Sequence, residues 1–372
     1  MKRRAAVTWK TKNMAAVFVF TVLALWGCSR QPQVTAVARP LMGTVVEISV
    51  VSRDEGRALH AIKAAFSEME RIERQMSFFR KDSELSRLNR RAGQQPVKVS
   101  SELWDLLRAS VRISQMTQGG FDVTVAPLLR LWPIYRAEKI LPTDAKIEEA
   151  LRHVGYGKLL LGQQDHTVAF ADPGMALDLG GIAKGHAIDR AVQILKGLGV
   201  QAALVNAGGD LYAYGRKPDG KPWRIGIRHP RQKEGILATA RVEGVAVVTS
   251  GDYERFFIKN GKRYSHIIDP RSGFTARETA AVTVVAPQAT LADGLATGVL
   301  VLGPEKGLSV VEGLPGVEAA VVREGPAGGL EFWVSTHFLT RLGVDAASIR
   351  RQGVRVVEWA GKRPRVAAPK SQ

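Results

Sequence analysis

Residues 237–250, LATARVEGVAVVTS, contain two consecutive strand-like segments, at 237–243 and 246–250, with no helix between them. Other short segments rich in β-branched residues predict strands over 202–206, 223–228, 264–268 and 281–286. Because the predicted helices lie mostly earlier in the chain, strands and helices do not alternate steadily. That order favours an α+β fold over a doubly wound parallel sheet. We therefore expect a single compact domain with a mixed, largely antiparallel sheet and flanking helices.

Helices are predicted where apolar residues recur at steps of three and four. Between 55 and 76 this series runs from Leu59 to Met76, and similar series predict helices over 102–116, about 182–198 and about 291–302. The segment from Gly43 to Val51 alternates instead, which predicts a strand with Val45, Ile48 and Val50 as core contacts. No linker rich in Pro, Ser or Gly divides residues 39–345, so we expect this region to be the functional domain.

The composition of the 372-residue chain is that of a globular protein with a sizeable core, since 45% of its residues are hydrophobic and 7% are aromatic. These fractions exclude a collagen-like repeat, a coiled-coil rod and disorder of the chain as a whole. Cys28 is the only cysteine. An intramolecular disulfide is therefore impossible, and cysteine-rich zinc sites and iron–sulfur clusters are excluded as well.

The N-terminal segment has the features of an export signal. Five cations without an acidic residue precede a mostly apolar stretch, 14–27, which is too short to span a bilayer comfortably as a helix. The stretch ends in Leu25-Trp26-Gly27-Cys28, which resembles a bacterial lipoprotein signal. We expect residues 1–27 to be removed, Cys28 to be lipidated, and residues 28–38 to form a polar, lipidated tether. An ordinary secretory signal with a chance cysteine is the alternative.

No later segment is predicted to span a membrane, so we expect an exported, soluble body that its lipid holds at the periplasmic face of the membrane. The formal net charge of +18 falls to +13 when the five cations of the signal are removed. Such a charge suits nucleic acid, an anionic lipid surface or an anionic substrate. Export argues against nucleic acid. Residues 346–372 are expected to be a basic, solvated C-terminal extension.

Two glycine-rich clusters have the character of ligand-binding turns. The first, Leu177–Gly185 (LDLGGIAKG), lies between a predicted strand and a predicted helix. Glycines there let a ligand approach the backbone, and the free N–H groups of a helix start favour an anion. Lys184 adds a positive charge, although the spacing matches neither the P-loop nor the dinucleotide fingerprint. The second cluster, Asn206–Asp210, stands at a strand end. A plain turn is the alternative for each.

Two further clusters carry side chains that could do chemistry. His266 precedes the turn Asp269–Gly273, where a strand delivers side chains to a rim, although a lone histidine is more often structural. Asp293 and Thr297 are four residues apart and share one helix face. Their oxygens suit Mg²⁺, which commonly shares substrate phosphates. The alternative for this pair is a capping box with Thr290 as the N-cap.

Taken together and in this order, the four clusters resemble the FAD:protein FMN transferase family, often called the ApbE family. The resemblance covers nearly all of residues 39–345, which it identifies as a flavin transferase domain. It is supported by the segments Arg39–Thr44, Met76–Arg80, Ser83–Asn89, Gly119–Thr124 and Thr249–Arg255.

Members of this family cleave the pyrophosphate of FAD and transfer FMN to a Thr or Ser hydroxyl of a partner protein, with release of AMP and a requirement for Mg²⁺. The resemblance therefore implies FAD as the substrate and Mg²⁺ as the metal. By motif, it assigns the FAD site to Met42, Phe79, Gly120, Phe121, Asp122, Asp178, Lys184, His266 and Ile267. It assigns the metal to Asp293 and Thr297, with main-chain oxygens of Gly181 and Ala296.

The attacking hydroxyl needs a base to take its proton. His266 is the first candidate, because the pKa of a histidine lies near working pH. Asp178 and Asp252 are less favoured candidates for the same role.

Two other functions remain open at this point. With water in place of the acceptor hydroxyl, the same site would be an FAD pyrophosphatase that forms FMN and AMP. The non-enzymatic alternative is a lipoprotein that stores or delivers flavin, which would not need the Asp293–Thr297 pair. The resemblance implies that the acceptor is a membrane redox subunit, such as one of a sodium-pumping or Rnf-type complex, or an exported reductase that carries flavin.

Overall fold

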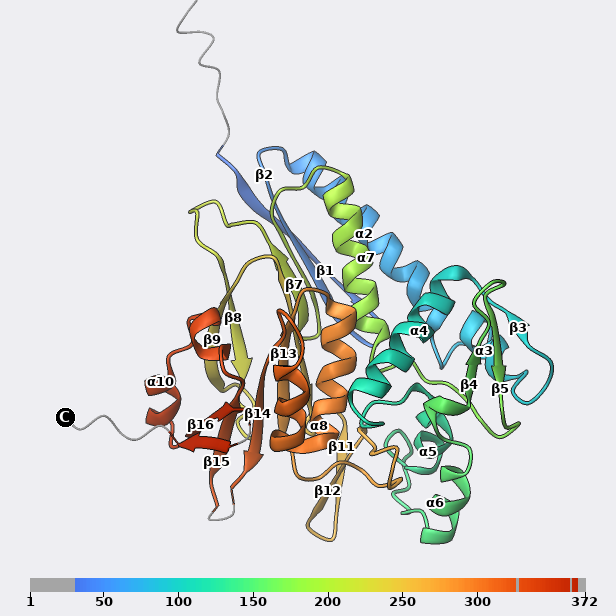
Figure 1. Cartoon of the computed structure of the whole chain (residues 1–372). Helices are drawn as coiled ribbons and strands as arrows, with labels where there is room; N and C mark the ends of the chain where they lie inside the picture. The colour runs from blue at the N-terminus through green and yellow to red at the C-terminus, as the bar shows by residue number, and fades with distance from the viewer. Residues whose placement is uncertain (1–30, 326–327, 362, 367–372) are drawn as a thin grey trace, which may run out of the picture.

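A mixed sheet runs through the centre of this computed structural model, which describes residues 31–325, 328–361 and 363–366. Ten strands form it, in the order β1-β2-β6-β7-β10-β13-β14-β15-β16-β17 (Figure 1). Their bounds are β1 Gln33–Leu41, β2 Thr44–Ser52, β6 Ala203–Ala207, β7 Asp210–Tyr214, β10 Val245–Gly251, β13 Ala281–Ala286, β14 Glu318–Glu324, β15 Leu330–Val334, β16 Arg355–Ala360 and β17 Arg363–Val366. Neighbours are antiparallel except β15 and β16, which are parallel. The expected α+β class and the largely antiparallel sheet are confirmed.

Each face of the sheet is covered by a different layer. One face carries long helices, α2 (Glu55–Met76), α7 (Ala183–Gly197) and α8 (Ala289–Glu312), with α4 (Ser101–Met116) packed beside α8 (Figure 1). The opposite face carries a hairpin of β8 (Trp223–Arg228) and β9 (Ile236–Val242) with two short helices, α9 (Phe338–Leu342) and α10 (Ala346–Arg351). An apolar core lies on each side of the sheet.

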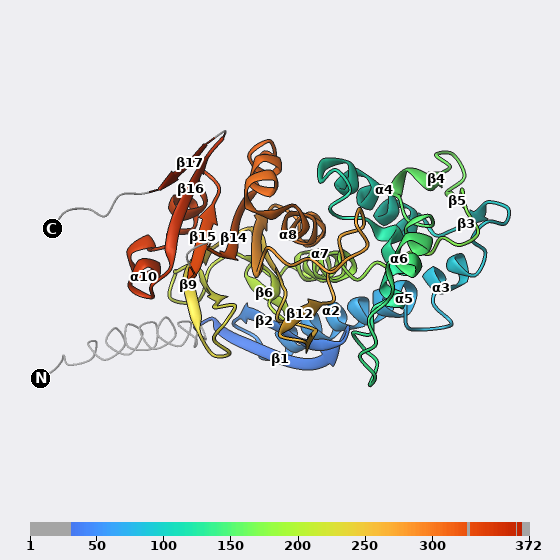
Figure 2. The same cartoon turned by 90° about the horizontal axis from the view of Figure 1, so that it is seen from below.

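A smaller lobe extends from α4 (Figure 2). It contains α3 (Glu84–Asn89), α5 (Ala126–Leu131), α6 (Asp144–Leu151), the 3₁₀ turns η1 (Val123–Val125) and η2 (Tyr156–Lys158), and a three-stranded sheet of β3 (Val97–Lys98), β5 (Thr167–Phe170) and β4 (Leu159–Leu161). The hairpin of β11 (Phe256–Lys259) and β12 (Lys262–Ser265) packs against this lobe, where Phe257 and Tyr264 join a core with Leu128 and Trp132.

Helix α2 shows how well the apolar periodicity locates a long amphipathic helix. It spans the predicted residues, 55–76. Asp54 is its N-cap, and the Asp54 side chain accepts a hydrogen bond from the Arg57 N–H at 3.0 Å. Ile62 and Phe66 of its apolar face are buried. Leu59 was expected on that face but is 43% exposed, because the small Ala58 and Ala61 face the core at this turn.

Strand β2 begins one residue later than predicted, and one of its core contacts was misassigned. Val46, Ile48 and Val50 are buried in a period of two. Val45 is 59% exposed because it lies on the opposite face of the strand from these three. The strand predicted over 264–268 is also shorter, since β12 ends at Ser265 and Ile268 forms only an isolated bridge with Thr275.

Regular structure extends further at both ends than the sequence pattern indicated. Residues 33–38, expected in the tether, belong to β1, which pairs with β2 from Gln33 opposite Ser52 to Leu41 opposite Thr44. Part of the expected basic extension also belongs to the fold. There α10 covers the sheet, and Val356, Val357 and Trp359 of β16 are buried. Backbone pairing with β2 therefore orders residues 33–38, whereas β16 is also held by buried apolar side chains.

Helix α8 is one element with a break in it. Gly303 has a φ of 78° and is followed by Pro304, so the first section ends where the sequence predicted, near residue 302. By length and composition α8 could cross a membrane, contrary to the expectation that no such segment follows the signal. However, 61% of its most apolar window is buried inside the fold, as in the core helix of a globular domain.

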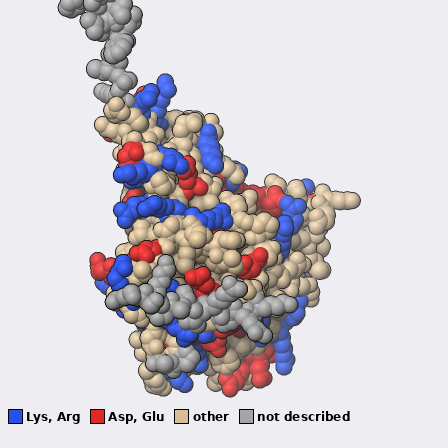
Figure 3. All heavy atoms as spheres, turned by 60° about the vertical axis from the view of Figure 1, so that its left-hand side comes forward, with Lys and Arg blue, Asp and Glu red and all other residues tan. Residues whose placement is uncertain are grey.

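Charges of both signs are mixed on the face formed by the β8–β9 hairpin and α10 (Figure 3). Arg216 pairs with Glu243 at 3.0 Å, and Arg231 pairs with Glu324 at 3.0 Å. These two cations of the face therefore lie beside carboxylates.

Candidate active site

A cavity of about 680 Å³ opens at the end of the sheet where β1 turns into β2, β6 turns into β7 and β10 ends. The helix starts of α7 and α8 face the same space. Its lining includes all nine residues that were assigned to the FAD site: Met42, Phe79, Gly120, Phe121, Asp122, Asp178, Lys184, His266 and Ile267. It also includes Gly181, Asp293 and Thr297 of the expected metal set. Ala296 is fully buried and is not part of the lining.

Asp293 and Thr297 lie beside the glycine loop that precedes α7. Asp293 is only 3% exposed, and its Oδ2 accepts a hydrogen bond from the Gly185 N–H at 2.9 Å. Burial, followed by the negative charge of Asp210, raises the pKa of Asp293 to about 7. A Cβ atom on Gly181 would lie 3.1 Å from Thr297 Oγ1. The Asp293 carboxylate, the Thr297 hydroxyl and the Gly181 backbone therefore line the same part of the cavity.

The alternative of a capping box at the start of α8 is wrong. The N-cap position is Gln288, which makes no side-chain capping bond. Thr290 Oγ1 instead donates to Asp189 Oδ2 of α7 at 2.6 Å. Asp293 is bonded to α7 as well, so its side chain faces the cavity region and not the amide groups of its own helix.

Lys184 sits between two carboxylates. Its Nζ donates to Asp210 Oδ2, and the other oxygen of Asp210 accepts from the Thr249 N–H at 3.1 Å. Burial acts to lower the pKa of Lys184, but the charges of Asp210 and Asp293 outweigh it and the pKa is raised. Lys184 is therefore a fixed cation at the start of α7, close to Asp293.

Asp178 forms one hydrogen bond within the same glycine loop and another to Val123. Its Oδ1 accepts from the Gly180 N–H at 2.7 Å, and its own N–H donates to the Val123 carbonyl at 2.8 Å. Burial raises the pKa of the Asp178 carboxyl, and the Gly180 bond opposes this. The residue thus holds the loop in shape, and Ile182 at the N-cap of α7 contributes no side-chain bond to the helix start.

Asp122 is a structural anchor of the cavity wall. One carboxylate oxygen accepts from the N–H and the hydroxyl of Thr124 at 2.8 and 2.7 Å, and the other accepts from the Tyr156 N–H at 2.8 Å. With both oxygens engaged, the carboxylate fixes the loop that presents Phe121. Gly120 is needed for space, since a Cβ atom there would lie 2.9 Å from the Gly298 carbonyl oxygen.

Met42 and Phe79 form the outer wall of the cavity. Met42 and Gly43 occupy the tight β1–β2 turn with φ of 54° and 71°, and the Met42 N–H donates to Glu73 at 2.9 Å. Phe79 is 72% exposed and meets the rings of Phe78 and Tyr135 edge-on, with centroids 5.7 and 5.9 Å away. This side therefore offers an aromatic surface, whereas the side near Asp293 is charged.

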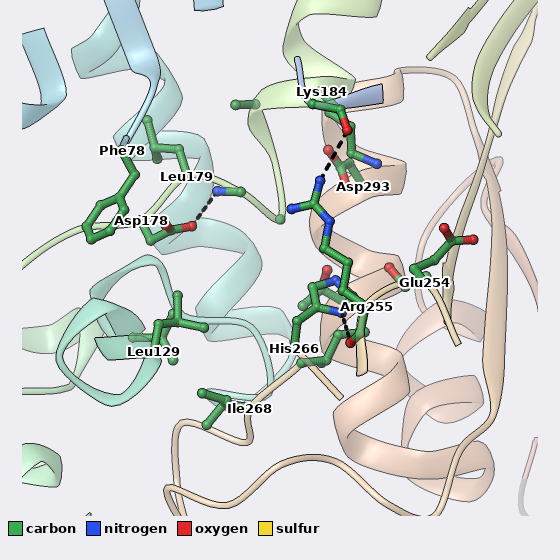
Figure 4. Close-up of a pocket in the computed structure, with 18 of the residues that line it drawn as sticks. Phe78, Leu129, Asp178, Leu179, Lys184, Glu254, Arg255, His266, Ile268 and Asp293 are labelled. Atoms are coloured by element: carbon green, nitrogen blue, oxygen red, sulfur yellow. Dashed lines mark hydrogen bonds between the residues drawn. The ribbon is translucent and has the colours of Figure 1, made fainter. Parts of the chain in front are cut away.

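His266 and Arg255 face the middle of the cavity (Figure 4). His266 Nδ1 donates to the Arg255 carbonyl at 3.3 Å, which leaves Nε2 as an acceptor. Burial, and then the charge of Arg255, lowers the pKa of His266 to about 4. The Arg255 guanidinium spans the opening, because it donates to the Tyr135 hydroxyl at 3.0 Å and to the Gly43 carbonyl at 3.3 Å.

Comparison with known proteins agrees with this geometry. The model of the ApbE family matches residues 42–321. The chain belongs to the ApbE family. Among relatives, it is 34% identical to the FAD:protein FMN transferase of Haemophilus influenzae over 80% of this chain and 88% of that protein. It is 33% identical to the protein of the same description from Treponema pallidum, over 86% of this chain and 92% of that protein.

Solved structures of ApbE proteins have the same fold. The apo form of the Pseudomonas stutzeri flavinyl transferase ApbE superposes with a TM-score of 0.75 at 34% identity, covering 85% of this chain and 99% of that one. The flavin transferase ApbE from Vibrio cholerae gives a TM-score of 0.76 at 31% identity, covering 83% of this chain and 99% of that one.

The ApbE-family site also contains residues to which the sequence assigned no role. Asp210 belongs to the second glycine-rich cluster, for which a plain turn is the alternative. In the structure it binds Lys184. Arg255 belongs to a segment that supports the resemblance. It lies next to His266 because the β11–β12 hairpin brings the two residues together. Asp252 is not a base here, because it is held by Arg231 through bonds of 2.7 and 2.9 Å.

Proposed function

We propose that this cavity cleaves the pyrophosphate of FAD and transfers FMN to a Thr or Ser hydroxyl of an acceptor protein, with AMP as the leaving group. The convergence of Asp293, Thr297 and Lys184 on the glycine loop carries this proposal. It places hard oxygen ligands and a cation where a helix start favours phosphate. The relatives' description as FAD:protein FMN transferases supports the same activity.

Mg²⁺ suits the residues at this point. Among the described residues, no three or more His, Cys, Asp or Glu side chains gather in a metal-binding cluster. A site made of one carboxylate, one hydroxyl, backbone oxygen and substrate phosphate fits Mg²⁺, which rarely uses an all-protein cage. The raised pKa of Asp293 next to Asp210 marks a place where a dication would relieve repulsion between carboxylates. Asp293 and Thr297, with the backbone at Gly181, would hold it. When bound, Mg²⁺ supplies Lewis-acid polarisation of the pyrophosphate.

The other residues of the site have separate tasks in the transfer. Lys184 and the amide of Gly181 hold phosphate oxygens as negative charge develops on them, while the Gly180 N–H stays bonded to Asp178. Phe79, with Met42, gives the flavin ring an apolar surface, since the phenyl group has a stacking face but no hydroxyl. These contacts fix the FMN phosphorus in front of the opening beside His266.

His266 Nε2 takes the proton of the acceptor hydroxyl as its oxygen attacks the FMN phosphorus. The bond from that phosphorus to the AMP oxygen breaks, and AMP leaves with the electron pair. The new bond is a phosphoester between FMN and the acceptor. The neutral state of His266, which its low pKa ensures at pH 7, leaves the Nε2 lone pair available.

The two alternatives differ from this reaction in different ways. A pyrophosphatase would use water at the same phosphorus, and a storage protein would leave the pyrophosphate intact. The protein acceptor is favoured because the relatives are named for it. The resemblance further suggests a membrane redox subunit or an exported reductase as the acceptor.

Export and anchoring complete the proposed function. Residues 1–27 and Cys28 lie outside the described residues. Their sequence supports removal of the signal and lipidation of Cys28, which would hold the enzyme at the periplasmic face of a membrane. Strand β1 begins at Gln33, so the folded domain would stand within about 17 Å of the anchored cysteine.

A fluorescent gel tests the reaction. The mature protein is incubated with FAD, Mg²⁺ and membranes from cells that lack this gene. A flavin-fluorescent protein band is expected, together with AMP, and EDTA should prevent both. Free FMN without a labelled band would support the pyrophosphatase, and intact FAD would support storage.

A further inference from the structure

The hairpin β11–β12 joins the two residues that face the middle of the cavity. Arg255 immediately precedes Phe256, and His266 immediately follows Ser265. The base of the hairpin is closed by the His266 N–H, which donates to the Arg255 carbonyl at 2.9 Å. In Figure 1 the hairpin projects from the lower edge of the molecule, beside the lobe that holds α5 and α6.

The two faces of this hairpin differ. Phe257 and Tyr264 point inward and stack with ring centroids 5.1 Å apart. Phe256 and Ile258 point outward and are 40% and 63% exposed. Neither of these outer side chains lines the cavity. A strand whose solvent-facing positions are apolar, in a sheet of only two strands, is a surface that other proteins normally cover.

The neighbouring loop packs on the inner face of the hairpin, where Lys139 Nζ lies over the Phe257 ring. Lys259 Nζ donates to the Lys139 carbonyl at 2.6 Å, which holds the loop against β11. Ile140 of that loop is 69% exposed, and Tyr135, bonded to Arg255, is 60% exposed. We call Phe256 and Ile258, on the outer face of β11, the rim surface.

The hairpin is also positively charged. Residues 256–265, FFIKNGKRYS, contain three cations and no carboxylate. The Arg263 guanidinium lies over the Phe256 ring at 3.9 Å and its Nε lies 3.8 Å from Asp252 Oδ2, so its charge is already paired. Lys262, in the same strand, is exposed. The turn Asn260-Gly261 has φ of 51° and 72°, the type I′ geometry that fixes a hairpin tightly.

We propose that the rim surface docks an extended segment of the acceptor protein, with apolar residues and carboxylates flanking the hydroxyl to be modified. This inference rests on the proposed function. A polypeptide hydroxyl must reach His266, and the hairpin ends at that residue. Apolar side chains of the segment would cover Phe256 and Ile258, and its carboxylates would meet Lys262. Binding on the outer face would therefore place the hydroxyl beside the base without contact with the FAD site.

The test compares strand residues of similar exposure. Phe256→Thr/Ile258→Thr removes the apolar cover and keeps residues that favour strands. Leu160→Thr is the matched control, since Leu160 is 54% exposed in β4 and does not line the cavity. With FAD and membranes from cells that lack this gene, the rate of band labelling should fall about tenfold or more in the double variant. The FAD dissociation constant should stay within about twofold, and the control should label at the wild-type rate. Lys262→Glu should slow labelling, whereas Lys262→Arg should not.

Three results would overturn the proposal. Labelling by the double variant at the wild-type rate removes the docking surface and leaves the transferase intact. A change of oligomeric state in the double variant assigns the rim surface to a second copy of the chain. If the wild-type protein labels no band, the proposed function fails, and the docking surface fails with it.

Discussion

Asp189 and Thr290 join α7 to the first turn of α8. Asp189 Oδ2 accepts hydrogen bonds from the Thr290 N–H at 2.8 Å and from its hydroxyl at 2.6 Å, and Oδ1 accepts from the Ala289 N–H at 2.8 Å. Asp293, one turn further along α8, accepts in return from Gly185 of α7. The two helices therefore cap one another. The position of Asp293 over the glycine loop depends on its own bond to Gly185 and on the bonds that Asp189 accepts.

Asp189→Ala should weaken Mg²⁺ binding, although Asp189 is not one of the proposed metal ligands. The change leaves two amide groups and a hydroxyl at the start of α8 without their acceptor, and the loss of a cap costs about 1–2 kcal/mol. Titration calorimetry with Mg²⁺ should show a lower affinity, and thermal unfolding should occur at a lower temperature. Asp189→Asn retains one acceptor oxygen. Its Mg²⁺ affinity and its unfolding temperature should therefore lie between those of the wild type and of Asp189→Ala. Unchanged Mg²⁺ affinity in Asp189→Ala would separate this cap from the site.

Gly185→Ala should be more damaging than an alanine at another glycine of α7. A Cβ atom on Gly185 would overlap the Ala289 carbonyl and lie 2.8 Å from the Asp293 Cβ, so the helices must separate. Gly197, at the end of α7, has no atom within 4 Å of such a Cβ. Gly197→Ala should therefore leave activity unchanged and add up to about 1 kcal/mol of stability. Equal effects of the two substitutions on turnover would contradict the tight α7–α8 contact.

Asp293→Asn should remove the charge that holds the dication and keep the shape of the side chain. The amide oxygen can still accept from the Gly185 N–H, so the fold should persist. The rate of FAD cleavage should fall by about 10²–10³-fold, as for loss of an electrostatic group in a transition state. Turnover close to wild type at low Mg²⁺ would place the metal elsewhere.

His266→Asn should abolish transfer and leave FAD binding nearly intact. The expected loss is about 10²–10⁴-fold, the range for a general base. Flavin fluorescence titration measures the binding, and the labelled band measures the transfer. A variant that still labels its acceptor at the normal rate would exclude His266 as the base.

The pH profile of transfer should also report on His266. Because burial and Arg255 lower its pKa to about 4, the residue stays neutral as the pH falls through 6.5. The rate should therefore hold down to about pH 5 and drop only near pH 4. Arg255→Ala removes one of the causes and should move this acid limb to higher pH. The same low pKa means that stability contributed by the neutral ring is full above about pH 6.5 and is lost as the pH falls toward 4. An acid limb at pH 6.5 in the wild-type protein would contradict the environment described for the ring.

The sequence located the parts of the fold that depend on a long, regular pattern. Helix α2 and the first section of α8 could be predicted because their apolar faces recur over several turns. Strand β1 could not, since none of its residues is buried and it is held by pairing with β2 along its length. Val45 and Leu59 were misplaced because the side of a strand or helix that meets the core depends on its neighbours.

Site residues divide in the same way. Lys184, Asp293 and Thr297, which belong to recognisable motifs, line one cavity. Asp210, Arg255 and Asp189 act through partners that are distant in the chain, or across a hairpin, and a single sequence gives little indication of such contacts. Asp122 and Ala296 were assigned from motif alone. The structure places the first as an anchor of its own loop and the second inside α8.

Mass spectrometry of the labelled protein tests the central claim most directly. The flavin-fluorescent band formed from FAD is digested, and its flavin-bearing peptide is sequenced. The predicted result is a Thr or Ser residue heavier by FMN less one water, with one AMP released per peptide. A peptide that carries whole FAD, or an unmodified acceptor beside free FMN and AMP, would contradict transfer from the cavity at Asp293 and His266.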